Sequence, residues 1–175
     1  MTGPARPFAE RHGWKLFRAS AFLESFATLE AEVARLALEN PEAFATHPKT
    51  KLLARIRDVI FDEIPRNPNA PIYGLGNTLG TSHRHWRRAK FLQRFRLFFR
   101  FDSESRIIIY AWVNDENTLR KAGARSDPYA VFARRLNEGR PPDHWDDLLS
   151  DAYGRESGLL AQQGDAQARS SRPER

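Results

Sequence analysis

Apolar and basic residues alternate along Arg94–Phe101. Successive side chains of a β-strand point to opposite faces of a sheet, so this pattern predicts a strand with two different faces. One face carries only apolar side chains, from Phe95, Leu97, Phe99 and Phe101. The other face is mainly basic and carries Arg94, Arg96, Phe98 and Arg100. A strand of this kind packs one face on a core and presents a row of cations on the other.

The positive charge of the chain is concentrated around this strand. Ile64–Phe101 is a stretch of 38 residues without Asp or Glu, and seven of its eight Arg and Lys lie between Arg84 and Arg100. Because the whole chain has a net charge of +6, the residues outside that cluster sum to −1. Positive charge concentrated in one short segment is typical of a surface that binds a phosphate backbone. The alternative is a solvated basic face that only keeps the protein soluble.

The order of the predicted elements indicates an α+β domain. A strand over 13–19 precedes two helices, over 20–40 and 48–64, whose apolar residues recur at helical spacing. A loop rich in Asn, Pro and Gly (65–82) leads into three strands near 84–91, 94–102 and 106–113. The last strand is apolar on both faces, as in a central strand covered from both sides. A helix over 127–139, with Asp127 as its cap and Pro128 at its first position, and a helix from 141 onward complete the chain.

We therefore expect a mostly antiparallel sheet of about four strands, with the two N-terminal helices and short C-terminal helices packed on one face. Residues 1–12 are predicted to be a flexible lead-in, residues 13–152 a single domain, and residues 153–175 a disordered tail.

Composition narrows the functional classes. The chain has no cysteine, which excludes disulfides and Cys-based zinc sites. Since no segment approaches the roughly 20 apolar residues of a membrane span, we expect a soluble, cytoplasmic protein that contacts no membrane. His83 and His85 lie two residues apart, but no acidic residue near them in the sequence completes a metal site, so we predict no metal and no cofactor. Either histidine can serve as a general base near neutral pH.

The clustered residues suit cleavage of RNA by its own 2′-hydroxyl. Such a reaction needs a positioned nucleotide and cations that stabilise the extra negative charge of the transition state. Arginine and lysine on a rigid strand supply these cations, and aromatic rings can stack on splayed bases. The candidates are Arg88, Lys90, Arg94 and Arg96 beside Trp86, with Tyr129 from the helix side.

Several runs of residues resemble one known family. They are Trp86–Phe91, Arg94–Phe101, Trp112–Arg120 and Asp127–Phe132, and the likeness extends over about residues 13–148. They resemble the YhaV-type toxins of bacterial type II toxin–antitoxin systems, in the RelE-like ribonuclease superfamily. The resemblance implies a small RelE-like domain that cleaves mRNA, often on the ribosome, and thereby inhibits translation and growth. It also implies neutralisation by a PrlF-type antitoxin, whose complex with the toxin contacts operator DNA through the antitoxin.

The resemblance also implies roles for individual residues. Arg88, Lys90 and Arg96 would be catalytic and stabilise the phosphate. The RNA-binding residues would be Trp86, Arg94, Arg100, Arg120, Lys121 and Tyr129. The residues leave a second hypothesis open, in which the same basic strand belongs to a non-catalytic inhibitor that blocks translation by occupying RNA or the ribosome.

Both hypotheses predict that RNA affinity depends steeply on salt. The logarithm of the binding constant should fall with the logarithm of salt concentration, with a slope of about −0.7 per neutralised phosphate on single strands. Fluorescence anisotropy with a labelled single-stranded RNA over a salt series measures this slope. A flat dependence would contradict both hypotheses.

Overall fold

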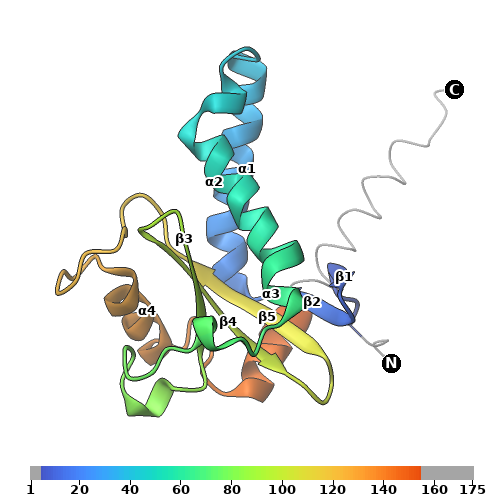
Figure 1. The fold of residues 1–175 in the computed structure, drawn as a ribbon, viewed down its shortest axis with the longest axis vertical. Coiled ribbons are helices and arrows are strands. Elements are labelled where there is room, and N and C mark those ends of the chain that lie inside the picture. Colours follow the sequence, from blue (N-terminus) through green and yellow to red (C-terminus); the bar gives the residue numbers. More distant parts are fainter. Residues whose placement is uncertain (1–4, 155–175) are drawn as a thin grey trace, which may run out of the picture.

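The fold centres on a five-stranded mixed sheet in the strand order β1-β2-β5-β4-β3, seen in a computed structural model that describes residues 5–154 (Figure 1). The strands are β1 (Ala9–Arg11), β2 (Trp14–Arg18), β3 (Arg87–Phe91), β4 (Phe95–Asp102) and β5 (Ile107–Val113). β2 and β5 run parallel, and the other neighbours are antiparallel. The predicted sheet of about four mostly antiparallel strands is therefore corrected to five strands with one parallel pair.

The additional strand, β1, lies within residues 1–12, where the sequence predicts a flexible lead-in. It pairs with β2 through a tight turn in which His12 and Gly13 both have positive φ angles. Three residues are too few to show an alternating pattern, so the sequence gives no sign of this strand. Of the tail predicted at 153–175, residues 155–175 lie outside the described residues, and residues 153 and 154 are helical.

Two long helices cover one face of the sheet. α1 (Ser20–Glu39) and α2 (Pro48–Asp58) form an antiparallel pair that stands out from the sheet in Figure 1. The second helix continues through a π-helical turn, η2 (Val59–Glu63), into α3 (Ile64–Arg66). Their apolar side chains pack on Leu97, Phe99 and Tyr110. This confirms the two predicted N-terminal helices.

The opposite face of the sheet is also covered, which corrects the prediction that the helices lie on one face. α4 (Pro128–Asn137) and a helix over residues 145–154 pack there. Phe132 of α4 stacks on Phe98 with the ring centroids 4.1 Å apart. Every residue of β5 is buried as a result, which confirms the prediction that this strand is covered from both sides.

The predicted alternation of β4 is confirmed. Phe95, Leu97, Phe99 and Phe101 all pack on the side of α1 and α2. A register shift between Phe98 and Phe99 pairs Phe98 with Trp112 and Phe99 with Tyr110. Because the apolar face of β4 lies against α1 and α2, its basic face lies on the side of α4, and the candidate site is on that side. No helix among the described residues is long and apolar enough to cross a membrane.

The start of α1 is held by the far end of the chain. Ser20 is the first helical residue, and Ala19 before it provides no side-chain cap. Instead, the Asp151 carboxylate accepts hydrogen bonds from the backbone N–H and the hydroxyl of Ser20, both at 2.8 Å. A carboxylate 131 residues away thus takes the place of a local cap.

Phe132→Ala should lower the free energy of unfolding by about 3–5 kcal/mol, because Phe132 is fully buried between Phe98, Trp86 and Trp112. Urea denaturation measures the change. Leu38→Ala is the control, since Leu38 on α1 is 85% exposed, and should change the stability by less than about 0.5 kcal/mol. Equal effects of the two substitutions would contradict the packing of α4 on the sheet.

Candidate active site

Two buried arginines converge on one tyrosine hydroxyl. Arg88 of β3 and Arg96 of β4 are 8% and 7% exposed. Their Nε groups donate hydrogen bonds to the Tyr129 hydroxyl at 2.8 and 3.2 Å. Tyr129 lies in the first turn of α4, which begins with Asp127 as N-cap and Pro128 at the first helical position, as the sequence predicts. The structure therefore brings together three of the predicted site residues.

In both guanidinium groups, Nη1 donates to two backbone carbonyls and Nη2 remains without a partner among the described residues. Nη1 of Arg88 donates to the backbone carbonyls of Ile72 and Gly74, and Nη1 of Arg96 donates to those of Gln93 and Phe95. Within the described residues, neither Nη2 group makes a hydrogen bond, and the single buried side-chain atom without a partner is Thr50 Oγ1. Both Nη2 groups therefore reach solvent and can bind a ligand with their two N–H donors each.

No carboxylate among the described residues pairs with Arg88 or Arg96. Better-exposed arginines are paired, for example Arg55 with Glu63 and Arg57 with Glu30. Burying an unpaired cation is costly, and a nearby anion would remove much of that cost. Two cations held by carbonyl and phenol oxygens, with one nitrogen of each facing solvent, form a seat for an anion such as a phosphate.

Arg120 completes the surroundings of Tyr129. Its guanidinium lies 4.9 Å from the centre of the tyrosine ring, and it forms an ion pair with buried Asp127. The Asp127 carboxylate also accepts from the backbone N–H of Lys121 and of Tyr129. One buried carboxylate thus connects the loop that carries Arg120 to the first turn of α4.

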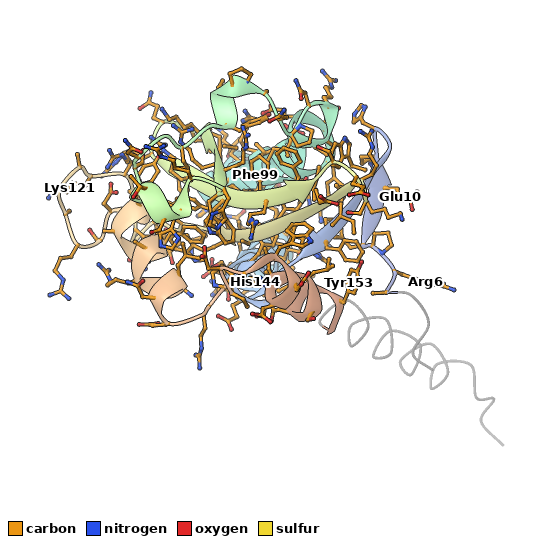
Figure 2. The ribbon with its side chains drawn as sticks, turned by 90° about the horizontal axis from the view of Figure 1, so that it is seen from below. Arg6, Glu10, Phe99, Lys121, His144 and Tyr153 are labelled. Carbon is orange, nitrogen blue, oxygen red and sulfur yellow. The ribbon has the colours of Figure 1, made fainter. Side chains whose placement is uncertain are left out.

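Exposed cations surround the buried pair. Lys90 lies directly opposite Arg96 in the β3–β4 register and is exposed. Arg94 is exposed as well, and its Nε donates to the Arg120 carbonyl. Lys121 lies on a loop at the edge of the molecule in Figure 2. Of the predicted RNA-binding residues, Arg94 and Arg120 are therefore linked to Tyr129 by contacts, and the backbone of Lys121 is linked to Asp127 at the start of α4.

Asn114 is a buried residue for which the sequence predicts no role. Its side-chain oxygen accepts from the Arg96 backbone N–H at 2.7 Å, and its amide donates to the carbonyls of Arg94 and Thr118. Asn114 therefore fixes the start of β4, the end of β5 and the following loop relative to one another. Its signal in the sequence is a polar residue at the end of an otherwise apolar strand.

Trp86 and Arg100 lie elsewhere on this face. Trp86 is fully buried, so its ring offers no free face to a base, which conflicts with the predicted stacking role. Arg100 lies between the rings of Trp86 and Trp145 and donates to the Asp143 carbonyl. Burial lowers the pKa of Arg100. Alternation along β4 correctly places Arg100 on the basic face, but it carries no information about the helices that cover that face.

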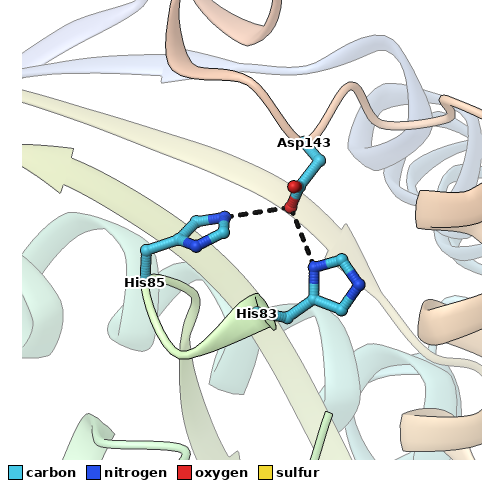
Figure 3. A group of neighbouring side chains, drawn as sticks. All are labelled: His83, His85 and Asp143. Carbon is cyan, nitrogen blue, oxygen red and sulfur yellow. Dashed lines mark hydrogen bonds and ion pairs between the residues drawn. The ribbon is translucent and has the colours of Figure 1, made fainter. Parts of the chain in front are cut away.

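The Asp143 carboxylate lies within hydrogen-bond distance of three side-chain nitrogens, from Trp86, His83 and His85. Its Oδ1 atom accepts from Trp86 Nε1 at 2.7 Å, and it lies 3.1 Å from His83 Nδ1 and 2.9 Å from His85 Nε2 (Figure 3). Burial alone would raise the pKa of Asp143, but the hydrogen bonds from Trp86 and His85 outweigh it, and the pKa lies below its usual value. The sequence missed this partner of the histidines because it lies 60 residues after His83.

Comparison with known families identifies the group to which the chain belongs. The model of the YhaV toxin family, described as a toxin with endonuclease activity of a toxin–antitoxin system, matches residues 16–153. The chain belongs to the YhaV toxin family. The match spans β2 to the C-terminal helix and contains Arg88, Arg96 and Tyr129. This membership makes the chain a toxin component with endonuclease activity.

Sequence identity to individual YhaV toxins supports the same assignment. The chain is 41% identical over 139 residues to the ribonuclease toxin YhaV of Escherichia coli K12, covering 78% of this chain and 90% of that protein. It is 40% identical over 142 residues to toxin YhaV of Escherichia coli O6:H1, covering 80% of this chain and 92% of the relative. No solved structure matches the chain, and the RelE-like relationship of this YhaV-family domain stays a prediction.

Tyr129→Phe should lower the free energy of unfolding by about 1–3 kcal/mol, because two buried guanidinium groups lose a shared acceptor while the ring remains. Tyr153→Phe is the matched control, since the Tyr153 hydroxyl makes no hydrogen bond among the described residues, and its effect should stay below about 0.5 kcal/mol. Chemical denaturation of both variants checks this. Two indistinguishable variants would show that the Tyr129 hydroxyl does not hold the arginines.

Proposed function

We propose that this chain is an mRNA endoribonuclease whose active site is the pair Arg88 and Arg96 with Tyr129. The observation that carries the proposal is the pair of buried guanidinium groups, which have no carboxylate partner within residues 5–154 and each keep Nη2 without a hydrogen bond there. The membership of the chain in a family of toxins with endonuclease activity supports the same reaction class.

The proposed reaction is attack of a ribose 2′-oxygen on the adjacent phosphorus. The new P–O2′ bond forms as the P–O5′ bond breaks, which yields a 2′,3′-cyclic phosphate and a 5′-hydroxyl. The proton of the 2′-hydroxyl leaves to a base, and the departing 5′-oxygen gains a proton. Negative charge grows on the non-bridging phosphate oxygens in the transition state, where preorganised donors are most effective.

The geometry suggests how each group would act. The Nη2 groups of Arg88 and Arg96 would bind the non-bridging oxygens, and the backbone carbonyls that hold their Nη1 groups would keep the pair in position. The Tyr129 hydroxyl already accepts two hydrogen bonds, so its own proton remains available for a phosphate oxygen. Lys90, opposite Arg96, would add positive charge at the open side of the site.

The exposed cations indicate the path of the RNA. The RNA would pass along a basic surface formed by Arg94, Arg120 and Lys121, which would bind the phosphate backbone on either side of the cleaved bond. Because this basic surface would otherwise bind RNA freely, we propose that a PrlF-type antitoxin neutralises the toxin by covering it. In this proposal the toxin acts in the cytoplasm on mRNA engaged by the ribosome, and operator DNA is contacted only through the antitoxin complex.

Arg96→Ala should lower the rate of RNA cleavage by about 10²–10³-fold, the usual effect of removing one transition-state donor. Cleavage of a 5′-labelled mRNA, with and without ribosomes, measures the rate, and circular dichroism checks folding. Arg87→Ala is the matched control, because Arg87 has the same charge and lies on the neighbouring strand β3, opposite Phe99, with its side chain on the other face of the sheet. It should leave cleavage near the wild-type rate.

A substrate with a 2′-deoxyribose at the cut site separates the possible mechanisms. It should resist cleavage, because the attacking oxygen is missing. Continued cleavage would contradict the 2′-hydroxyl mechanism. Intact RNA in every reaction, together with inhibited translation, would favour the non-catalytic occupancy mechanism instead.

A further inference from the structure

We propose that His83, His85 and Asp143 bind a divalent transition-metal cation, with Zn²⁺ as the favoured ion. The two histidines come from the short helix η4 (Thr81–His83) and the residues that follow it, and Asp143 comes from the segment before the C-terminal helix. In Figure 3 both imidazole rings direct a nitrogen at the same carboxylate oxygen. The inference concerns a site separate from the proposed RNA chemistry.

The distances suit a shared cation. His83 Nδ1 and His85 Nε2 lie 3.1 and 2.9 Å from Asp143 Oδ1, and the three ligand atoms all lie within 4.8 Å of one another. Bonds of about 2.0–2.2 Å to a tetrahedral zinc place neighbouring ligand atoms about 3.3 Å apart. Small rotations of the two imidazole rings would therefore bring three ligands around one ion.

The hydrogen bonding of Asp143 favours a cation at this point. Among the described residues, every side-chain donor to its carboxylate reaches Oδ1, namely Trp86 Nε1 and the two histidine nitrogens. Three donors therefore crowd one carboxylate oxygen. The indole nitrogen can only donate, but each imidazole can carry its proton on the other ring nitrogen and present a lone pair to a ligand. A divalent cation would then lie between the carboxylate oxygen and the two imidazole nitrogens, in place of the two N–H protons.

Surrounding groups hold the carboxylate in place. Trp86 Nε1 donates to Oδ1 from a fully buried ring, and Arg100 donates to the Asp143 backbone carbonyl at 2.7 Å. Outer hydrogen bonds of this kind orient metal ligands and are typical of metal sites in proteins. The carboxylate is consequently positioned before any ion binds.

The ligand set and its exposure indicate the kind of ion. Two imidazoles and one carboxylate suit zinc and similar transition metals, whereas Mg²⁺ and Ca²⁺ prefer oxygen ligands throughout. The side chains of His83, His85 and Asp143 are 18%, 35% and 38% exposed. An ion can therefore enter from solvent, and water can occupy its remaining position.

The location indicates a structural effect. Arg100, which contacts Asp143, lies four residues after Arg96 on β4, so the histidine cluster is about 14 Å along the strand from Arg96, while Arg88 on β3 lies two residues, about 7 Å, from Trp86. A bound ion would join two segments of the chain that are 60 residues apart. We therefore expect it to stabilise the fold rather than to take part in cleavage.

Isothermal titration of the full, chelator-treated chain with ZnCl₂ at neutral pH tests the proposal. One equivalent should bind, and saturating ZnCl₂ should raise the midpoint of thermal unfolding by about 5 °C. MgCl₂ at the same concentration should produce neither effect.

His85→Gln should weaken Zn²⁺ binding by at least about 100-fold, since it removes one of three ligands. His144→Gln is the matched control, because His144 is exposed and next to Asp143 but is not a member of the cluster. It should leave the affinity unchanged. A wild-type chain that binds no Zn²⁺, or equal affinities for the wild type and His85→Gln, would show that the cluster is only a hydrogen-bonded contact. Loss of binding in His144→Gln would overturn the assignment of the three ligands.

Discussion

Two buried guanidinium groups share one phenol oxygen, and this arrangement restricts how the rest of the chain can be placed. Arg88 and Arg96 can remain buried only if oxygen atoms take their hydrogen bonds, because the described residues offer them no carboxylate. Tyr129 supplies one such oxygen, so α4 must lie over the basic ends of β3 and β4. The carbonyls of Ile72 and Gly74 supply two more, so the loop before β3 must return to the same place.

Further contacts secure this arrangement from the opposite side. Asn114 holds the backbone of Arg96 and of the loop that follows β5, while Asp127 connects that loop to the start of α4. Asn114 binds only backbone groups, and Asp127 binds the backbone and the Arg120 side chain, so among the described residues neither occupies the Nη2 groups of Arg88 and Arg96. The positive charge is thus held rigidly without being neutralised, which is the condition that preorganised electrostatic stabilisation requires.

The features that the sequence predicted are those set by short-range patterns. The alternation of β4, the two-sided burial of β5 and the Asp127–Pro128 start of α4 each depend on neighbouring residues, and each agrees with the structure. Alternation also placed Arg96 and Arg100 on one face of β4, whereas the register that puts Arg88 on the same face is visible only in the structure. The sequence could not show which helix covers that face, and for this reason Trp86 was predicted to stack on a base although it is part of the core.

Contacts between distant segments account for the remaining differences. The parallel pairing of β2 with β5 and the approach of Asp143 to His83 depend on how the chain returns on itself, which no local pattern records. β1 is too short to be recognised outside its hairpin. Asn114 is a related case, because its polarity is visible in the sequence whereas its three backbone partners are visible only in the fold.

The contact between Ser20 and Asp151 has a consequence for the order in which the molecule can form. The Asp151 carboxylate that binds the start of α1 exists only after synthesis has passed residue 151, and Arg88 and Arg96 likewise lack their phenol oxygen until residue 129 has been added. A partly synthesised chain therefore has neither the finished helix start nor the oxygen shared by the two arginines. The site that we propose for RNA is consequently assembled only when nearly the whole domain has been made.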